Sequence, residues 1–117
     1  MLIYENIEVT GTALVEHDLK LTELFPPFGV RSWGLQFKMD TSSTPVGVVF
    51  LKASVDGEMY EEYPNTRSSI ASMVDWTVAN HKIWSIEHME SIYPLFKVCF
   101  QLTSGTLLVK EIRITRI

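Results

Sequence analysis

The chain has 117 residues, of which 46% are hydrophobic, and its formal net charge is −4. A chain of this length and composition is expected to fold as a single domain, residues 1–117, around one hydrophobic core. The ten Lys and Arg residues are scattered, and the net charge is negative, so the sequence argues against a nucleic-acid-binding protein.

The N-terminus and the cysteine usage point to a protein made and kept in a cytoplasm. The opening stretch MLIYENIEV contains an early acid and no basic region, unlike a secretory signal peptide. No apolar run approaches the roughly 20 residues needed to span a bilayer, so no membrane association is expected. Cys99 is the only cysteine and cannot form an internal disulfide.

The first half of the chain shows alternation typical of strands. Short strands are predicted at 2–9 and 12–16. In SWGLQFKM, the residues Trp33, Leu35, Phe37 and Met39 fall on one face, which predicts a half-buried strand. The stretch VGVVFLKASV, from residue 46, is more uniformly apolar and predicts a central strand that is partly covered on both faces.

The second half repeats this pattern. The segment 67–78 fits either a helical turn or a strand with Val74, Trp76 and Val78 inward, and a strand is predicted around 82–88. The stretches PLFKVCFQL and TLLVKEIRITRI flank a Thr-Ser-Gly turn at 103–105, which predicts an antiparallel hairpin. The apolar positions of the last stretch change from odd to even numbers, which predicts a β-bulge near Lys110.

Many short strands with frequent turn residues indicate an all-β fold. We predict an antiparallel β-sandwich with jelly-roll topology. An immunoglobulin-like sandwich is the alternative.

The Asp56-Gly57 pair raises the question of a metal loop. The regular Asp spacing of a calcium loop with its distal Glu is missing, and so is the pattern of a sialidase Asp-box. The simpler interpretation is a tight turn in which Gly57 adopts positive φ and Asp56 caps neighbouring amides.

No pattern of catalytic or metal-binding residues emerges. His17, His81 and His88 lack zinc-ligand spacing, and no G-x-S-x-G motif is present. Cys99 lies in mid-strand, where a nucleophile is poorly placed. We therefore predict a protein that is not an enzyme and has no cofactor or metal. A small hydrolase or lyase with two carboxylates about 5 to 9 Å apart is the residual alternative.

Aromatic residues outside the strand cores are the candidates for partner binding. Trp33, Trp76 and Trp84 align with apolar neighbours and are expected in the core. Two large rings in a proline-stiffened loop either cover the end of the sandwich or contact a partner. The predicted partner-binding residues are Phe25, Pro26, Pro27, Phe28, Tyr60 and Tyr63.

Apolar residues on the predicted outer face suggest an oligomer. Leu95, Cys99 and Leu108 lie off the main inward face, where water would favour polar side chains. A second chain covering them would explain their character.

The stretch VGVVFLKASVDGEMY resembles a pattern of small virion proteins of tailed bacteriophages. The matching elements are P-x-G at Pro45 and Gly47, A-S-x-D-G at 53–57, an aromatic at Tyr60, Trp84 in a following strand, and T-S-G-T at 103–106. The resemblance covers residues 45 to 107. It departs at Val55, where Asn is more usual, and at Tyr60, where Trp is more usual.

This resemblance implies a non-enzymatic β-sandwich in the virion, assembled in the host cytoplasm. Its first functional expectation is a capsid decoration (cement) protein that binds the major capsid protein or another virion protein as a homo-oligomer, with a trimer favoured. A carbohydrate-binding module on a host-recognition appendage is the alternative, with Tyr60, Tyr63 and Trp76 as stacking residues.

Overall fold

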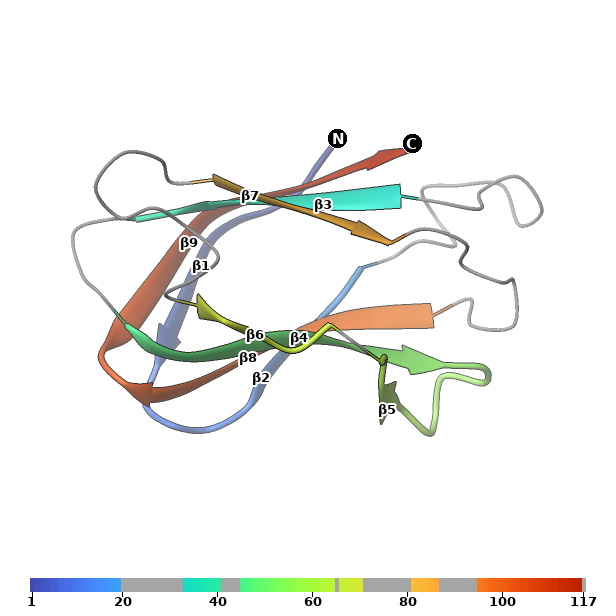
Figure 1. Ribbon diagram of the computed structural model, residues 1–117, viewed down its shortest axis with the longest axis horizontal. Helices are drawn as coiled ribbons and strands as arrows, with labels where there is room; N and C mark the ends of the chain where they lie inside the picture. Colours follow the sequence, from blue (N-terminus) through green and yellow to red (C-terminus); the bar gives the residue numbers. More distant parts are fainter. Residues whose placement is uncertain (20–32, 41–44, 65, 71–80, 87–94, 117) are drawn as a thin grey trace.

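The computed structural model describes residues 1–19, 33–40, 45–64, 66–70, 81–86 and 95–116. The elements described within these ranges are nine β-strands, arranged in two layers (Figure 1). In chain order they are β1 (Leu2–Thr10), β2 (Val15–Asp18), β3 (Trp33–Met39), β4 (Val46–Ser54), β5 (Glu61–Glu62), β6 (Ser68–Ser69), β7 (His81–Ile86), β8 (Leu95–Ser104) and β9 (Thr106–Arg116).

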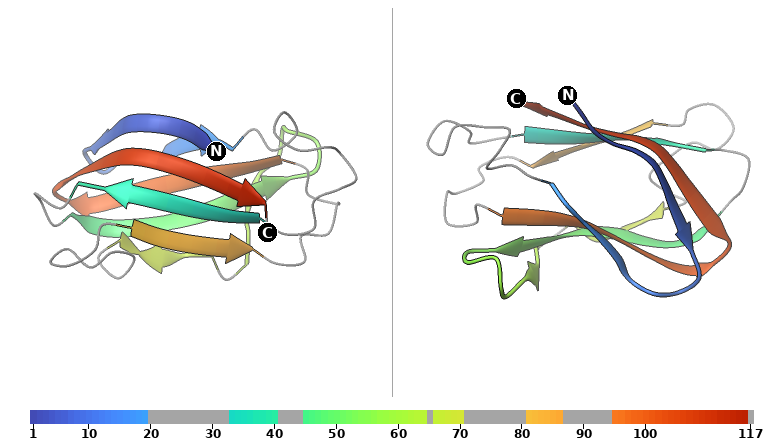
Figure 2. Two further views of the ribbon diagram at one scale, coloured as in Figure 1. Left: turned by 90° about the horizontal axis from the view of Figure 1, so that it is seen from above. Right: turned by 180° about the vertical axis from the view of Figure 1, so that it is seen from behind.

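The strands form two antiparallel sheets. Sheet A has the order β1-β9-β3-β7, which Figure 2 shows from above. Sheet B has the order β2-β8-β4-β5, and β6 also pairs with β4. The strands predicted at 12–16 and 82–88 are observed at Val15–Asp18 and His81–Ile86. The predicted all-β antiparallel sandwich is confirmed.

The order of the strands is that of a jelly roll. Consecutive strands repeatedly belong to opposite sheets: β1 and β2, β3 and β4, and β8 and β9 each divide between sheets A and B. An immunoglobulin-like sandwich would instead keep several consecutive strands paired within one sheet. The chain therefore wraps around the core, as the first of the two predicted topologies requires.

The predicted hairpin of residues 94–102 and 106–117 is wrong. β8 pairs with β2 and β4, whereas β9 pairs with β1 and β3. The chain turns at Gly105, where φ is 79°, and enters the other sheet. Two strands with apolar inner faces and a short turn satisfy alternation whether they lie side by side or face each other across a core. Alternation alone could not separate these two arrangements.

The core fills the space between the two inner faces. The ring of Phe37 on β3 meets that of Phe100 on β8 edge-on, with centroids 6.1 Å apart, and so joins the two sheets at the centre. The cluster of buried residues is Ile7, Val9, Leu19, Leu35, Phe37, Met39, Val49, Leu51, Ala53, Ile70, Phe96, Val98, Phe100, Leu102, Leu107, Val109, Ile112 and Ile114.

The predicted bulge at Lys110 is confirmed. Between β3 and β9, Lys38 lies opposite Glu111 while Met39 lies opposite Val109, so Lys110 is an extra residue on β9. Before the bulge the buried residues of β9 are odd-numbered, and after it they are even-numbered. The extra residue keeps both halves of the strand facing the core.

The neighbouring strand β1 has an irregular backbone conformation next to this bulge. Asn6 has φ of 53° and lies between Glu5, which faces Glu111, and Ile7, which faces Val109. Asn tolerates the left-handed region better than most residues. The two strands bend together from one layer towards the other, as the right panel of Figure 2 shows.

Candidate functional site

The Asp56-Gly57 turn has the geometry that the sequence predicts. Gly57 has φ of 84°. Asp56 Oδ1 accepts hydrogen bonds from the amides of Glu58 (2.9 Å) and Met59 (3.1 Å), and from the Ser54 hydroxyl at 3.1 Å. Ser54 Oγ in turn accepts from the Gly57 amide at 2.8 Å. The amides that donate to the Asp56 carboxylate lower its pKa.

This turn presents two apolar side chains to solvent. Val55 is 64% exposed and Met59 is 74% exposed. We call residues 55–59 the apolar tip. A Cβ on Gly57 would lie 3.1 Å from Leu95 Cδ1, so the tip sits against the start of β8. The hydrogen bonds around Asp56 hold these exposed side chains on an ordered backbone.

Acidic residues surround the apolar tip. Asp56 and Glu58 lie within it, and Glu61 and Glu62 follow after Tyr60; all four are exposed. Residues 55–62 contain no Lys or Arg. The apolar side chains of the tip are therefore flanked in the chain by acids, of which Glu62 is paired with Arg67. The sequence shows these acids, but it gave no reason to select Val55 and Met59 as exposed.

The two tyrosines predicted to bind a partner are both engaged with the chain itself. Lys97 Nζ lies 4.1 Å from the centroid of the half-buried Tyr60 ring. The ring of Tyr63 packs on the core residue Phe96, with centroids 5.4 Å apart. Each of the two rings therefore makes a contact within its own chain.

Several sequence-predicted residues lie outside the described part of the chain. These are Phe25, Pro26, Pro27 and Phe28 of the proline-stiffened loop, His88, and Trp76 with most of the ambiguous segment 67–78. The backbones of Trp33, His81 and Trp84 are described as parts of β3 and β7, but their side chains are not.

A cluster of ionic groups covers the outer face of sheet B. Glu16 on β2 bridges two lysines: its Oε1 lies 2.5 Å from Lys52 Nζ and its Oε2 lies 3.5 Å from Lys97 Nζ. The hydrogen bond from Lys52 is the largest cause of the lowered pKa of Glu16, and the charge of Lys97 adds to it. The ion pair with Glu16 raises the pKa of Lys52.

A second ion pair lies beside this cluster. The Arg67 guanidinium donates to both carboxylate oxygens of Glu62, with the shortest contact at 2.5 Å. The same guanidinium lies 4.3 Å from the centroid of the Phe50 ring. Phe50 is only 3% exposed although it lies on the outer side of β4. Sheet B thus covers apolar surface with charged side chains whose stems are apolar.

Cys99 is also buried on this face, within a single chain. Its cross-strand neighbours are Glu16 and Phe50, and its exposure is zero. Burial is the main reason why the pKa of the thiol is raised to about 11. Cys99 is therefore already covered within one chain and gives no support for a second chain over this face. Leu95 and Leu108 are half-buried, so they do not require such a cover either.

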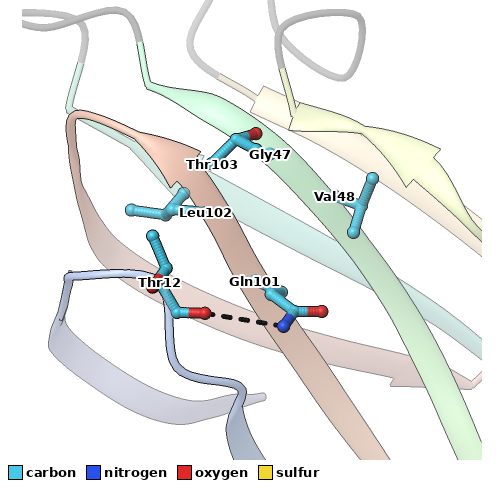
Figure 3. Close-up of a pocket in the computed structure, with 6 residues that line it drawn as sticks. All are labelled: Thr12, Gly47, Val48, Gln101, Leu102 and Thr103. Carbon is cyan, nitrogen blue, oxygen red and sulfur yellow. Dashed lines mark hydrogen bonds between the residues drawn. The ribbon is translucent and has the colours of Figure 1, made fainter.

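A shallow hollow of about 330 Å³ lies over β4 and β8 (Figure 3). Gln101 Nε2 at its floor donates to the carbonyl oxygen of Thr12 at 3.5 Å. None of the lining side chains among the described residues is titratable. Its lining residues are Thr12, Gly47, Val48, Gln101, Leu102 and Thr103.

The P-x-G element (Pro45 and Gly47) and the T-S-G-T element (103–106) lie next to each other beside this hollow. A Cβ on Gly47 would lie 2.4 Å from the carbonyl oxygen of Gln101 and 2.8 Å from Leu102 Cα, so only glycine fits between the strands. A Cβ on Gly105 would lie 3.1 Å from Pro45 Cα. Thr103 Oγ1 also donates to the carbonyl oxygen of Val46 at 3.2 Å. The P-x-G and T-S-G-T elements thus form one close contact.

The described ranges hold no cluster of three or more His, Cys, Asp or Glu side chains that could bind a metal ion. They also contain no helix with the length and hydropathy of a membrane span. Comparisons with protein-family models, with curated protein sequences and with solved structures find no match.

Proposed function

We propose that this protein is a non-enzymatic structural protein of a bacteriophage virion, and specifically a capsid decoration protein. Support comes from the resemblance over residues 45 to 107 and from the kind of surface that the sandwich presents. In this proposal the protein acts as a homo-oligomer, with a trimer favoured, and its partner is the major capsid protein or another virion protein.

The apolar tip is the observation that carries the proposal. Apart from the N-terminal Met1, Val55 and Met59 are the most exposed large apolar side chains among the described residues. Asp56 and Ser54 fix the backbone between them through four hydrogen bonds. A fixed apolar anchor loses little conformational entropy on binding, which is what a protein–protein contact needs. Methionine also adapts its shape to an apolar hollow.

The charge around the tip indicates the chemistry of the partner surface. Glu58 and Glu61 are exposed and neighbour the apolar residues. A complementary surface has an apolar hollow for Met59 and a rim of Lys or Arg. Such pairing speeds association and weakens as salt rises.

Decoration would stabilise the shell through binding alone. A protein that binds assembled subunits and not free ones shifts the equilibrium towards the shell in proportion to its concentration and affinity. The ion pairs on the outer face of sheet B and the jelly-roll core suit this role, because a preformed module binds without a large rearrangement.

Co-sedimentation tests the proposal. Empty shells assembled from the major capsid protein encoded in the same genome are mixed with the purified protein and pelleted. We expect saturable binding with fixed stoichiometry, and a shell that resists heat better when decorated. Protein that remains in the supernatant at every concentration would contradict the proposal. Analytical ultracentrifugation of the protein alone checks the favoured trimer.

A further inference from the structure

His17 occupies an unusual position at one edge of the sandwich. It is on the edge strand β2, opposite Val98 of β8. Its ring meets that of Tyr4, on the edge strand β1 of the other sheet, with centroids 5.2 Å apart and an interplanar angle of 60°. The Tyr4 hydroxyl donates to the carbonyl oxygen of Asp18, next to His17. These contacts join β1 to β2 where the two sheets meet.

The imidazole of His17 is half-buried, and one of its two nitrogens lacks a polar partner in the described part of the chain. His17 Nε2 is buried, and it has no hydrogen-bond partner among the described residues. Its chain neighbours Glu16 and Asp18 are exposed on the other side of β2, where Glu16 binds the two lysines. Tyr4 is the one titratable group in ring contact with it among the described residues, and the hydroxyl of Tyr4 is committed to Asp18.

We propose that His17 makes the β1–β2 edge of the sandwich sensitive to mild acid. Protonation places a charge beside the Tyr4 ring edge and the core with no carboxylate to balance it. The charged ring is then better accommodated in water, which favours release of β2 from β1 and from its ladder with β8. The Tyr4–Asp18 hydrogen bond breaks in the same movement. This device is independent of the proposed virion function.

The pH range follows from the direction of the shift. Burial lowers the pKa of His17 below its ordinary value, and no neighbouring charge contributes. The folded chain therefore binds fewer protons than the unfolded chain below about pH 6.5. Stability is complete above that value and falls as the pH falls towards the lowered pKa. The lowered pKa values of Glu16, Asp56 and Glu62 act in a more acidic range.

The experiment measures the His17 titration and the opening of β2 in the full chain. NMR follows the His17 imidazole between pH 8 and 4.5, and hydrogen exchange follows the β2 amides at pH 7.5 and 5.5 after correction for intrinsic rates. We expect a titration midpoint below 6.5. We also expect the open population of β2 to rise by up to about tenfold per pH unit, with the centre of β4 unaffected.

Two variants separate this device from general acid instability. His17→Phe keeps a ring against Tyr4 and removes the titration, so the pH dependence of β2 exchange should disappear. His88→Gln removes a different imidazole and should leave that dependence intact. A His17 midpoint at or above 6.5 in the unmodified protein, or β2 exchange that does not change between pH 7.5 and 5.5, would overturn the proposal even if His17→Phe failed to fold.

Discussion

Lys52 on β4 and Lys97 on β8 lie directly opposite each other on the outer face of sheet B. Like charges in such a pair repel and destabilise a sheet. Here Glu16 of β2 approaches both ammonium groups, at 2.5 and 3.5 Å, and cancels their repulsion. A third strand thus makes a like-charged pair acceptable, and the same carboxylate lies over the buried Cys99.

Glu16→Gln tests this bridge. The substitution keeps the size of the side chain but leaves the two lysines unbalanced, so the free energy of unfolding should fall by about 1 kcal/mol. Urea unfolding measures the change. Glu8→Gln replaces an exposed glutamate of β1 and should change stability by less than about 0.5 kcal/mol. Equal losses in both variants would contradict the bridging role.

The same bridge predicts part of the acid dependence. Because Lys52 and Lys97 lower the pKa of Glu16, its contribution is present above about pH 4.5 and is lost as the pH falls through the lowered pKa. The stability curves of Glu16→Gln and the unmodified protein should therefore converge at low pH. Parallel curves down to pH 2 would show that the carboxylate does not contribute through its charge.

Gly47→Ala tests the close approach of β4 and β8. The new Cβ would meet backbone atoms of Gln101 and Leu102, which cannot move without disturbing the sheet. We expect a loss of about 2–3 kcal/mol. Gly11→Ala is the matched control: its φ is 74° but nothing lies within 4 Å, so backbone strain alone should cost about 1 kcal/mol. A smaller loss at position 47 than at position 11 would contradict the contact.

The thiol of Cys99 should react only slowly with thiol reagents in the folded protein. Its thiol is buried, and its pKa is raised to about 11, so little thiolate is available at pH 8. Labelling with a thiol-reactive disulfide reagent at pH 8 should be more than about 100-fold slower in buffer than in 8 M urea. Comparable rates in the two conditions would show that the outer face of sheet B is open.

Asp56→Ala should loosen the apolar tip without unfolding the sandwich. The variant loses the acceptor for the Glu58 and Met59 amides, so their hydrogen exchange should accelerate by about tenfold or more while β4 stays protected. Asp56→Asn keeps an acceptor oxygen, so its exchange rates at Glu58 and Met59 should lie between those of Asp56→Ala and the unmodified protein. Because the pKa of Asp56 is lowered, the native tip should stay ordered until the pH falls below about 3.8. Unchanged exchange in Asp56→Ala would remove the structural basis of the tip.

The sequence predicted the elements of the fold better than their partners. Alternation in β3 and the change of phase at Lys110 identified strands and a bulge, because each depends on residues that are close in the chain. The pairing of β8 depended on strands far away, and the hairpin at Gly105 was wrong for that reason. A turn residue specifies a turn, but it does not specify which sheet the chain enters next.

The surface was harder to predict than the core. The Asp56-Gly57 turn could be predicted because its hydrogen bonds are local. The burial of Cys99 could not be predicted, because Glu16 is distant in the sequence and becomes its neighbour only through the pairing of β2 with β8. Tyr63 looked like an exposed ring, yet the break between β5 and β6 directs it against Phe96. Long side chains on strand edges hide apolar surface in ways that periodicity does not record.

The proposed function predicts that the apolar tip is the surface that binds the partner. The most direct test is the affinity of Met59→Asp for empty shells, compared with that of Val46→Asp. Val46 is 54% exposed and lies at the opposite end of β4, so it controls for the loss of any exposed apolar residue (Figure 1). We predict that Met59→Asp weakens binding by more than about tenfold, while Val46→Asp binds like the unmodified protein. Equal affinities for the two variants, or a loss confined to Val46→Asp, would contradict the claim.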